Sequence, residues 1–499
     1  MKGISTLAVA AGLFVAGSGA IQLVQRDGPP AVVGFDIQRR KVSSPLARDR
    51  IRRRATSTTV SQTLDNEETL YFANVSLGTP AQNLRLHIDT GSSDLWTNSA
   101  KSKLCKMKSD PCSASGSYSA NSSSTYKYVS SDFNISYVDG SGAVGDYATD
   151  TLRIGGKDLT DLQFGIGYTS SSEEGIIGIG YTVNEIQVNR NNKSAYPNVP
   201  QLMMEKGIIQ SNAYSLWLND LQASEGAILF GGVNSDKFHG DLETLPILSE
   251  DGVYAEFIIT LTGVGYTSGG KNTSLTSSNT AAAVLLDSGS SLTYLPDDIA
   301  ESIFDAFGAQ YDSQEEAAFV PCSLANNDTT LDFTFSSPTI SVSMNELVIN
   351  PGTNPDGSTV TFKDGTPACI FGIGPAGDST SVLGDTFIRS AYVVYDLSRN
   401  EISLAQTNFN STTDNILEIT NTTIPDAHVV ANPVTSVAAQ TGGARIGAPS
   451  GTGIIGGSGT AVATSTATTT GSSKSAAAPK NVPLGAVLGL AGVGLMLVI

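Results

Sequence analysis

The stretch LRLHIDTGSSDLW, Leu84–Trp96, places Asp89 among small, turn-forming residues directly after an apolar strand. Aspartate, glycine and serine are common in turns, because their side chains bond the local backbone and glycine adopts positive φ. The stretch alone is therefore compatible with an ordinary turn. The pattern occurs a second time, however. AAAVLLDSGSSLTYLP, Ala281–Pro296, repeats the apolar strand, the Asp-Ser/Thr-Gly-Ser-Ser core and the apolar and aromatic residues that follow.

The second aspartate, Asp287, occupies the same position in its copy as Asp89 does in the first. Each copy is followed, at a similar distance, by an apolar-apolar-glycine element: EGIIGIG with Gly178, and TSVLGDTFIR with Gly384. A turn residue has no reason to recur with its whole context. The repeat therefore predicts two homologous lobes related by a pseudo-twofold axis, with the two aspartate loops meeting at the centre.

Two carboxylates at hydrogen-bonding distance do not both ionise readily, so such a pair holds one proton over a broad acidic range. The ionised member can act as a general base on a shared water, and the protonated member can donate to a substrate carbonyl. Gly91 and Gly289 let backbone N–H groups approach the carboxylates. Neighbouring hydroxyls can hold the loops and bind the aspartates: Thr90, Ser92, Ser288 and Ser290. This chemistry needs no metal, cofactor or covalent nucleophile.

The paired motifs resemble those of the pepsin-type (A1) aspartic proteases, over about residues 63–408. The resemblance implies a mostly β, bilobal fold: two pseudo-twofold-related β-rich lobes with a cleft between them and a β-hairpin flap. It implies that Asp89 and Asp287 are the catalytic dyad. It also implies that Gly91, Gly289 and Ser290 contact the substrate.

FNISYVDGSGAVG, residues 133–145, matches the flap of this family, which closes over an extended peptide. The match implies that Tyr137 is the flap tyrosine and that Trp96 binds it through the indole N–H. Asp139 and Gly140 at the flap tip are then expected to contact substrate. Taken alone, Tyr137 and Trp96 are compatible with core packing, and Asp139 with a solvated turn.

The rest of the body reads as short alternating or β-branched runs separated by glycine and asparagine turns, which predicts an all-β body with minor helices. Helical periodicity is clearest over Val199–Ile209 and Asp297–Tyr311. GIGPAG, residues 372–377, matches a dinucleotide-binding pattern only formally, because it contains a proline and no helix follows. The chain has three histidines, and none forms a serine-hydrolase constellation.

Both ends of the chain carry targeting signals. Residues 1–20 have a positive start, an apolar run and a small-residue end, which predicts a signal peptide; a transmembrane helix is the alternative. Residues 21–54 are basic and contain RRK (39–41) and RRR (52–54), which predicts a prosegment cut after paired basic residues; a solvated linker is the alternative. The formal net charge of −18 argues against nucleic acid as a partner.

From residue 410 the composition shifts to threonine, serine, alanine and glycine, which predicts an O-glycosylatable stalk over 410–473. An apolar tail after a polar spacer then predicts a GPI-anchor signal over 474–499, with attachment around 471–475. A C-terminal membrane helix is the alternative. The body between these ends divides into an N-terminal lobe over 55–245, with the first aspartate and the flap, and a C-terminal lobe over 246–409 with the second aspartate.

The cysteines and sequons agree with secretion. Four cysteines predict two disulfides paired by neighbourhood, Cys105–Cys112 and Cys322–Cys369, which also fit the resemblance. A zinc site is the rival interpretation, but the spacings match no CxxC pattern. Eight sequons predict a glycoprotein: Asn74, Asn121, Asn134, Asn192, Asn272, Asn327, Asn410 and Asn421.

Signal, basic prosegment, stalk and anchor together resemble the fungal cell-surface branch of the family, the yapsins and anchored candidapepsins. The resemblance implies a monomeric, acid-active endopeptidase of protein and peptide substrates, held by its anchor at the outer face of the cell membrane or in the wall. The acidic body favours cleavage at basic residues. The segment between Cys105 and Cys112 is short, however, and flanked by lysines, where yapsins carry a long acidic insertion. Cleavage at apolar residues is the alternative, and a non-catalytic binding protein on the same scaffold is a second one.

Overall fold

The computed structural model describes residues 30–40, 70–137, 141–223, 225–313, 315–352, 358–420 and 423–437. The predicted signal peptide and anchor signal lie outside these residues, as do most of the prosegment and the end of the stalk. The flap-tip residues Asp139 and Gly140 and the sequon residue Asn421 also lie outside them.

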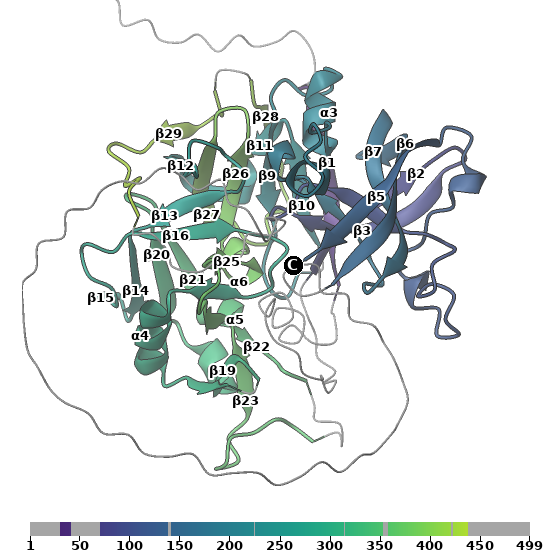
Figure 1. The fold of residues 1–499 in the computed structure, drawn as a ribbon. Coiled ribbons are helices and arrows are strands. Elements are labelled where there is room, and N and C mark those ends of the chain that lie inside the picture. The colour runs from purple at the N-terminus through teal and green to yellow at the C-terminus, as the bar shows by residue number, and fades with distance from the viewer. Residues whose placement is uncertain are drawn as a thin grey trace, which may run out of the picture. The chain divides into compact units, whose positions relative to one another are not determined.

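The largest sheet has 14 strands in the order β29-β12-β27-β26-β9-β10-β1-β2-β3-β8-β4-β7-β6-β5. Its N-terminal part consists of β2 (Leu70–Leu77), β3 (Gln82–Asp89), β4 (Leu95–Asn98), β5 (Lys127–Ser136), β6 (Gly142–Ile154), β7 (Lys157–Ser170) and β8 (Gly175–Gly178). Its other strands are β1 (Val33–Arg40), β9 (Ala213–Trp217), β10 (Glu225–Phe230), β12 (Phe238–Pro246), β26 (Ala391–Asp396), β27 (Glu401–Thr407) and β29 (Ala427–Val429). Figure 1 shows the β2–β7 strands on one side of β9 and β10, and the C-terminal half on the other.

The C-terminal half adds three smaller sheets. One contains β13 (Ile258–Leu261), β16 (Ala282–Leu286), β25 (Val382–Leu383), β17 (Thr293–Leu295) and β24 (Ile373–Pro375). The second contains β14 (Gly263–Ser268), β15 (Lys271–Ser274), β20 (Thr330–Thr334) and β21 (Thr339–Ser343). The third contains β18 (Gln310–Asp312), β19 (Ala317–Pro321), β22 (Val348–Ile349) and β23 (Ala368–Phe371). A separate two-stranded sheet joins β11 (Gly232–Asn234) to β28 (Ile416–Glu418).

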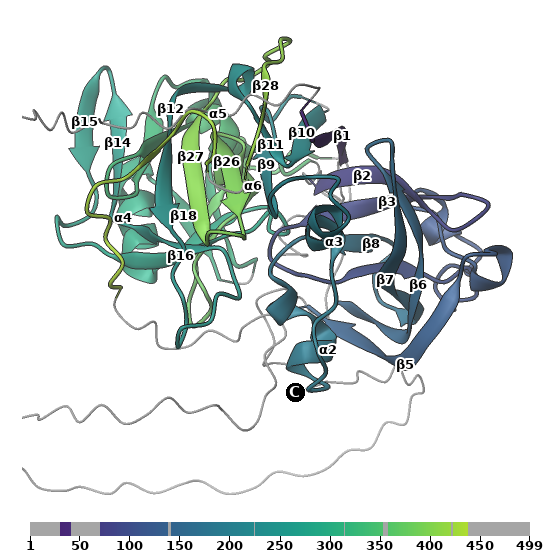
Figure 2. The same ribbon diagram turned by 90° about the horizontal axis from the view of Figure 1, so that it is seen from above.

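The helices of the described residues are short: α2 (Ile186–Asn189), α3 (Val199–Glu205), α4 (Asp297–Phe307), α5 (Met344–Leu347) and α6 (Asp385–Ile388). Both helices predicted from periodicity form, and both end earlier than predicted. Helix α4 stops because Gly308 adopts φ 65°, the left-handed conformation that glycine tolerates without strain. Helix α3 begins at the cap Asn198, whose side chain accepts the amide of Gln201, and it lies beside β7 (Figure 2).

The repeat found in the sequence is also a repeat of topology. Strand β3 pairs in parallel with β8, which places Asp89 opposite Gly178. Strand β16 pairs in parallel with β25, with Leu286 opposite Leu383, so Asp287 and Gly384 follow in the same register. Each aspartate thus stands at the end of a buried strand beside a glycine of its partner strand. This pairing explains why each motif is followed by an apolar-apolar-glycine element.

Strand β1 departs from the predicted boundaries. The sequence predicts that the body begins near residue 55, but Val33–Arg40 pairs with β10 along one edge and with β2 along the other. Val33 and Ile37 are buried, and Phe35 packs on Phe230 with ring centroids 6.1 Å apart. The apolar side chains at alternate positions of β1 pack against the body and hold the strand in the sheet. The basic residues around it hide the alternation in the sequence.

The C-terminal boundary also needs correction. The sequence predicts an unfolded stalk from residue 410, but β28 pairs with β11 and β29 pairs with β12. Ile419, Ile424 and Val430 are buried against these strands. The segment lacks aromatic residues, so its composition resembles a stalk. A few well-placed isoleucine and valine side chains, together with backbone pairing, are enough to hold it on the body.

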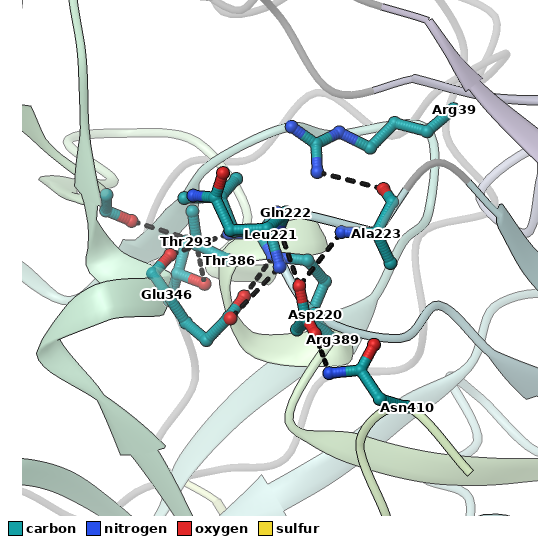
Figure 3. A network of polar contacts seen from close by, with 11 residues as sticks. Arg39, Asp220, Leu221, Gln222, Ala223, Thr293, Glu346, Thr386, Arg389 and Asn410 are labelled. Carbon is teal, nitrogen blue, oxygen red and sulfur yellow. Dashed lines mark hydrogen bonds and ion pairs between the residues drawn. The ribbon is translucent and has the colours of Figure 1, made fainter.

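A buried ion pair joins the C-terminal end of α6 to α5, two segments distant in sequence (Figure 3). The Arg389 guanidinium donates to the Glu346 carboxylate at 2.5 Å and to the Glu346 backbone carbonyl at 2.6 Å, and both side chains are almost fully buried. The other carboxylate oxygen of Glu346 accepts the amide of Leu221 at 3.0 Å. Nearby, Arg39 of β1 donates to the carbonyl of Ala223 at 3.2 Å. These bonds tie α5, α6, the loop after β9 and β1 together.

Candidate active site

The two predicted aspartates are bound by their own loops in the same way. Asp89 accepts the amide of Gly91 at 2.9 Å on one carboxylate oxygen and the hydroxyl of Ser92 at 2.6 Å on the other. In the second loop, Asp287 accepts the amide of Gly289 at 2.7 Å and the hydroxyl of Ser290 at 2.8 Å. Both carboxylates are buried. Each is therefore fixed in orientation by one amide and one hydroxyl.

The loops are also bonded to each other across the pseudo-twofold axis. The amide of Ser288 donates to Thr90 Oγ1 at 2.9 Å, and the amide of Thr90 donates to Ser288 Oγ at 3.2 Å. Each hydroxyl then donates onward to the opposite strand: Thr90 to the carbonyl of Leu286 at 3.0 Å, and Ser288 to the carbonyl of Ile88 at 3.1 Å. These four hydrogen bonds between the two aspartate segments fix the separation of the loops.

Glycine at position 91 is required by this close approach. A Cβ atom on Gly91 would lie 2.6 Å from a carboxylate oxygen of Asp287 and 2.8 Å from its carbon. Because Gly91 itself donates to Asp89, the Asp287 carboxylate stands directly beside the group that holds its partner. The glycines of the parallel strands are equally confined. A Cβ on Gly178 would meet the amide of Ser93 at 2.6 Å, and one on Gly384 the carbonyl of Leu292 at 2.2 Å.

The hairpin of β5 and β6 carries Tyr137 next to this site. The indole N–H of Trp96 donates to the Tyr137 hydroxyl at 2.7 Å, and both side chains are buried. The Tyr137 amide donates to the carbonyl of Ser141 at 2.8 Å, at the turn end of the hairpin. A pocket lies between the hairpin and the Asp89 loop, and its lining includes Ser92, Tyr137 and Ile186. The expected partnership of Trp96 with Tyr137 is thus present, inside an apolar cluster.

A family model described as eukaryotic aspartyl protease matches residues 70–407, which is most of the chain and includes both aspartate loops and the hairpin. The chain belongs to this family. It is an aspartic-type endopeptidase with the mostly β, pepsin-like fold.

Relatives with known names agree with this assignment. The chain is 56% identical to "Probable aspartic-type endopeptidase opsB" of Aspergillus oryzae, over 97% of each chain. It is 34% identical to "Aspartic proteinase yapsin-3" of Saccharomyces cerevisiae, over 73% of this chain and 71% of the relative. Among solved structures, the aspartic proteinase from Irpex lacteus matches with a TM-score of 0.57 and a sequence identity of 21%. The match covers 77% of this chain and 100% of the Irpex lacteus chain. The resemblance to the fungal yapsin-like branch is thus supported.

Both disulfides of the protease form as expected, between Cys105 and Cys112 and between Cys322 and Cys369. Most of the predicted sequon asparagines that the structure describes are exposed: Asn74, Asn121, Asn192, Asn272, Asn327 and Asn410; Asn134 is partly buried. Within the described ranges, no helix has both the length and the apolar character needed to cross a membrane.

The sequence did not point to a cluster of buried acids behind the Asp89 loop. Asp94 accepts the hydroxyls of Tyr147 at 2.7 Å and Tyr196 at 2.8 Å and the amide of Ile186 at 2.8 Å. The neighbouring Glu185 accepts the amide of Tyr196 at 2.9 Å. Burial raises the pKa of Asp94, against the effect of these bonds, and raises that of Glu185 to about 10. The aspartate in the motif DLW was the only available signal, because its tyrosine partners lie far along the chain.

Proposed function

We propose that Asp89 and Asp287 are the catalytic dyad with which this endopeptidase hydrolyses peptide bonds, through a water activated between them. The observation that carries the proposal is the exchange of bonds between Thr90 and Ser288. It brings two identically bonded carboxylates together at the ends of two equivalent strands. A dyad held in this way needs no reorganisation when charge develops in the transition state.

The proposed reaction begins with the ionised carboxylate, which takes a proton from the water as its oxygen attacks the scissile carbonyl carbon. The protonated carboxylate donates its proton to the carbonyl oxygen, so the tetrahedral intermediate carries no net charge. In the second step the carboxylate that lost its proton takes one from the intermediate, and the other donates one to the leaving nitrogen. The C–N bond breaks, and the dyad again holds one proton.

Gly91, Gly289 and Ser290 are proposed to contact the substrate from the two loops, with Thr90, Ser92 and Ser288 as their support. Tyr137, Asp139 and Gly140 are proposed to contact it from the flap. The bond from Trp96 supports Tyr137 in a fixed orientation, so that closure of the flap over an extended peptide excludes water from the reacting bond.

We further propose a monomeric zymogen with a signal peptide at 1–20 and processing within 21–54. The mature body then works outside the cell in acid, as a glycoprotein anchored by GPI at the cell membrane or moved to the wall. No nucleic acid takes part. Relatives named "Secreted aspartic protease 8" and yapsin-3 support entry into the secretory pathway. The acidic composition supports a preference for basic residues at the cleavage site.

The dyad is tested by Asp89→Asn and Asp287→Asn, with Asp298→Asn as a matched control on the exposed face of α4. Each dyad variant is expected to lose peptide cleavage while it keeps the thermal unfolding of a folded body. The control is expected to keep both. Measurable pepstatin-sensitive cleavage by either dyad variant would contradict the assignment. Wild-type protein without such cleavage at acid pH would instead favour the non-catalytic alternative.

A further inference from the structure

A third acidic residue, Glu256, lies near Asp287, just before the start of β13. Strands β13 and β16 are antiparallel, with Ile258 opposite Leu285. The register continues past the end of β13, because the amide of Leu286 donates to the carbonyl of Phe257 at 3.1 Å. Glu256 precedes Phe257 at a bend, and Asp287 follows Leu286, so an extension of this register by one residue would bring Glu256 opposite Asp287.

This position puts the two side chains on the same face. In an antiparallel ladder, directly opposed residues point to the same side, and pairs without mutual backbone bonds come closest, with Cα atoms about 4.5 Å apart. Since the amide of Leu286 bonds the carbonyl of Phe257, Glu256 and Asp287 would form the closer kind of pair in an extended ladder. Phe257 is fully buried on the opposite face, whereas Glu256 remains partly exposed. Glu256 therefore shares the side of the strand pair on which Asp287 meets Asp89.

Glu256 has no cationic partner there among the described residues. Burial and the negative charge of Asp287 raise its pKa to about 7. With this pKa the Glu256 carboxyl holds its proton at the acid pH at which the enzyme is proposed to work. A cation that reaches it favours the ionised form, so binding of the cation releases the proton. Water is excluded from such a position once a peptide fills the cleft. A lysine or arginine side chain then gains more from the pair than it would at the surface.

We propose that Glu256 is a specificity-determining residue, which pairs with a lysine or arginine side chain of the substrate next to the scissile bond. An extended peptide presents alternate side chains to opposite walls of a cleft. Only one position near the dyad can therefore reach Glu256, and the preference it confers is confined to that position.

The test uses the secreted full-length enzyme and peptide pairs that differ only by lysine or methionine at each position flanking the scissile bond. In wild type, kcat/KM is expected to favour lysine at one position. Glu256→Gln is expected to lower the ratio of kcat/KM for lysine over methionine at that position by about tenfold, as for loss of a charged hydrogen bond. Glu301→Gln, an exposed control on α4, is expected to keep the preference.

Because this role presupposes the proposed preference for basic side chains, the outcomes separate the two. If wild type shows no preference for lysine at any position, the broader proposal fails and this one fails with it. If wild type prefers lysine and Glu256→Gln retains the preference, only the role of Glu256 is refuted. Loss of the preference in Asp139→Asn but not in Glu256→Gln would assign it to the flap instead, and would likewise overturn the role of Glu256.

Discussion

Thr90 and Ser288 exchange the same pair of bonds: the hydroxyl oxygen of each accepts the backbone amide of the other, at 2.9 Å and 3.2 Å. The sequence difference between the two copies, threonine in one and serine in the other, leaves this exchange intact. What the site requires at both positions is a hydroxyl group, which accepts a backbone amide of the opposite segment and donates to a backbone carbonyl of that same segment.

Thr90→Val tests this requirement, because valine keeps the shape and removes the hydroxyl. The buried amide of Ser288 and the carbonyl of Leu286 would each lose a partner, at about 1–3 kcal/mol per group. We expect a lower free energy of unfolding in urea and a large fall in kcat, because the loops are no longer fixed against each other. Thr90→Ser is the control and is expected to stay near wild type. A fully active valine variant would show that the hydrogen bonds between Thr90 and the opposite loop do not position the two aspartates.

The hydroxyl of Tyr137 offers a second test, of the flap. Tyr137→Phe leaves the Trp96 indole N–H without its 2.7 Å partner. The matched control, Tyr118→Phe, also deletes a buried tyrosine hydroxyl, one that donates to Asp150 at 2.5 Å. Both variants are expected to lose about 1–3 kcal/mol of stability. Only Tyr137→Phe is expected to lower kcat/KM, by at least tenfold. Equal effects on kcat/KM would mean that the hydroxyl serves packing alone.

The dyad loops could be predicted because the relevant information is local and occurs twice. Asp89, its glycine and its hydroxyls lie within a few residues, and the second copy around Asp287 predicts that the two aspartates act as a pair. The glycine elements around Gly178 and Gly384 recur with the motif for the same reason, whereas their parallel pairing with the aspartate strands is a finding of the structure. A motif that occurs twice can be recognised from the sequence without knowledge of the rest of the fold.

Contacts between distant segments could not be predicted in this way. Glu256 faces Asp287 only because β13 pairs with β16, and Asp94 meets Tyr196 only because the chain returns behind the loop. Strand β1 was hidden by its basic neighbours, and the strands beyond residue 410 by a composition typical of stalks. In each case pairing between distant segments decides the local structure, and local composition does not reveal that pairing.

The place of β1 in the sheet bears on processing. The bond between Arg39 and Arg40 belongs to a strand paired with β2, so a protease cannot draw it into an extended, unpaired conformation. We expect a trypsin-like protease to spare this bond in the folded chain and to cut it after unfolding in urea. Mass spectrometry of the two digests distinguishes these outcomes. Cleavage at the same rate in both would show that β1 leaves the sheet readily.

The buried pair of Arg389 and Glu346 is expected to be sensitive to the loss of either partner. Glu346→Gln removes the charge that compensates a fully buried guanidinium. Breaking such a pair typically costs about 3–5 kcal/mol. The expected result is a marked fall in the urea midpoint. Asp161→Asn, which breaks the exposed pair with Lys127, is expected to cost less than about 1 kcal/mol. Equal losses would show that burial adds nothing to the pair at Arg389.

The buried acids predict that the protein is most stable in acid. The pKa of Glu185 is raised by burial to about 10, and that of Glu256 to about 7, from an ordinary value of 4.5. A raised folded-state pKa means that the folded protein binds the proton more tightly, so stability is full below about 4.5 and is lost as the pH rises above it. For Asp132, partial burial acts against the bonds from Lys193 and Ser130, but its pKa is lowered overall. The stability due to Asp132 is lost as the pH falls below 3.8. Together these three groups contribute most to stability in mildly acid solution, at about pH 4 to 5.

Glu185→Gln isolates one of these contributions. Glutamine stays neutral and can still accept the amide of Tyr196, so the variant should escape part of the loss at higher pH. We expect its free energy of unfolding, relative to wild type, to rise between pH 4.5 and pH 7 by up to about 1.4 kcal/mol per pH unit. Urea unfolding at three pH values measures this slope, with Glu301→Gln as the exposed control, for which the slope should be flat. Parallel curves for Glu185→Gln and wild type would mean that Glu185 is already ionised in the folded protein, with its charge compensated inside the cluster of Asp94 and Tyr196.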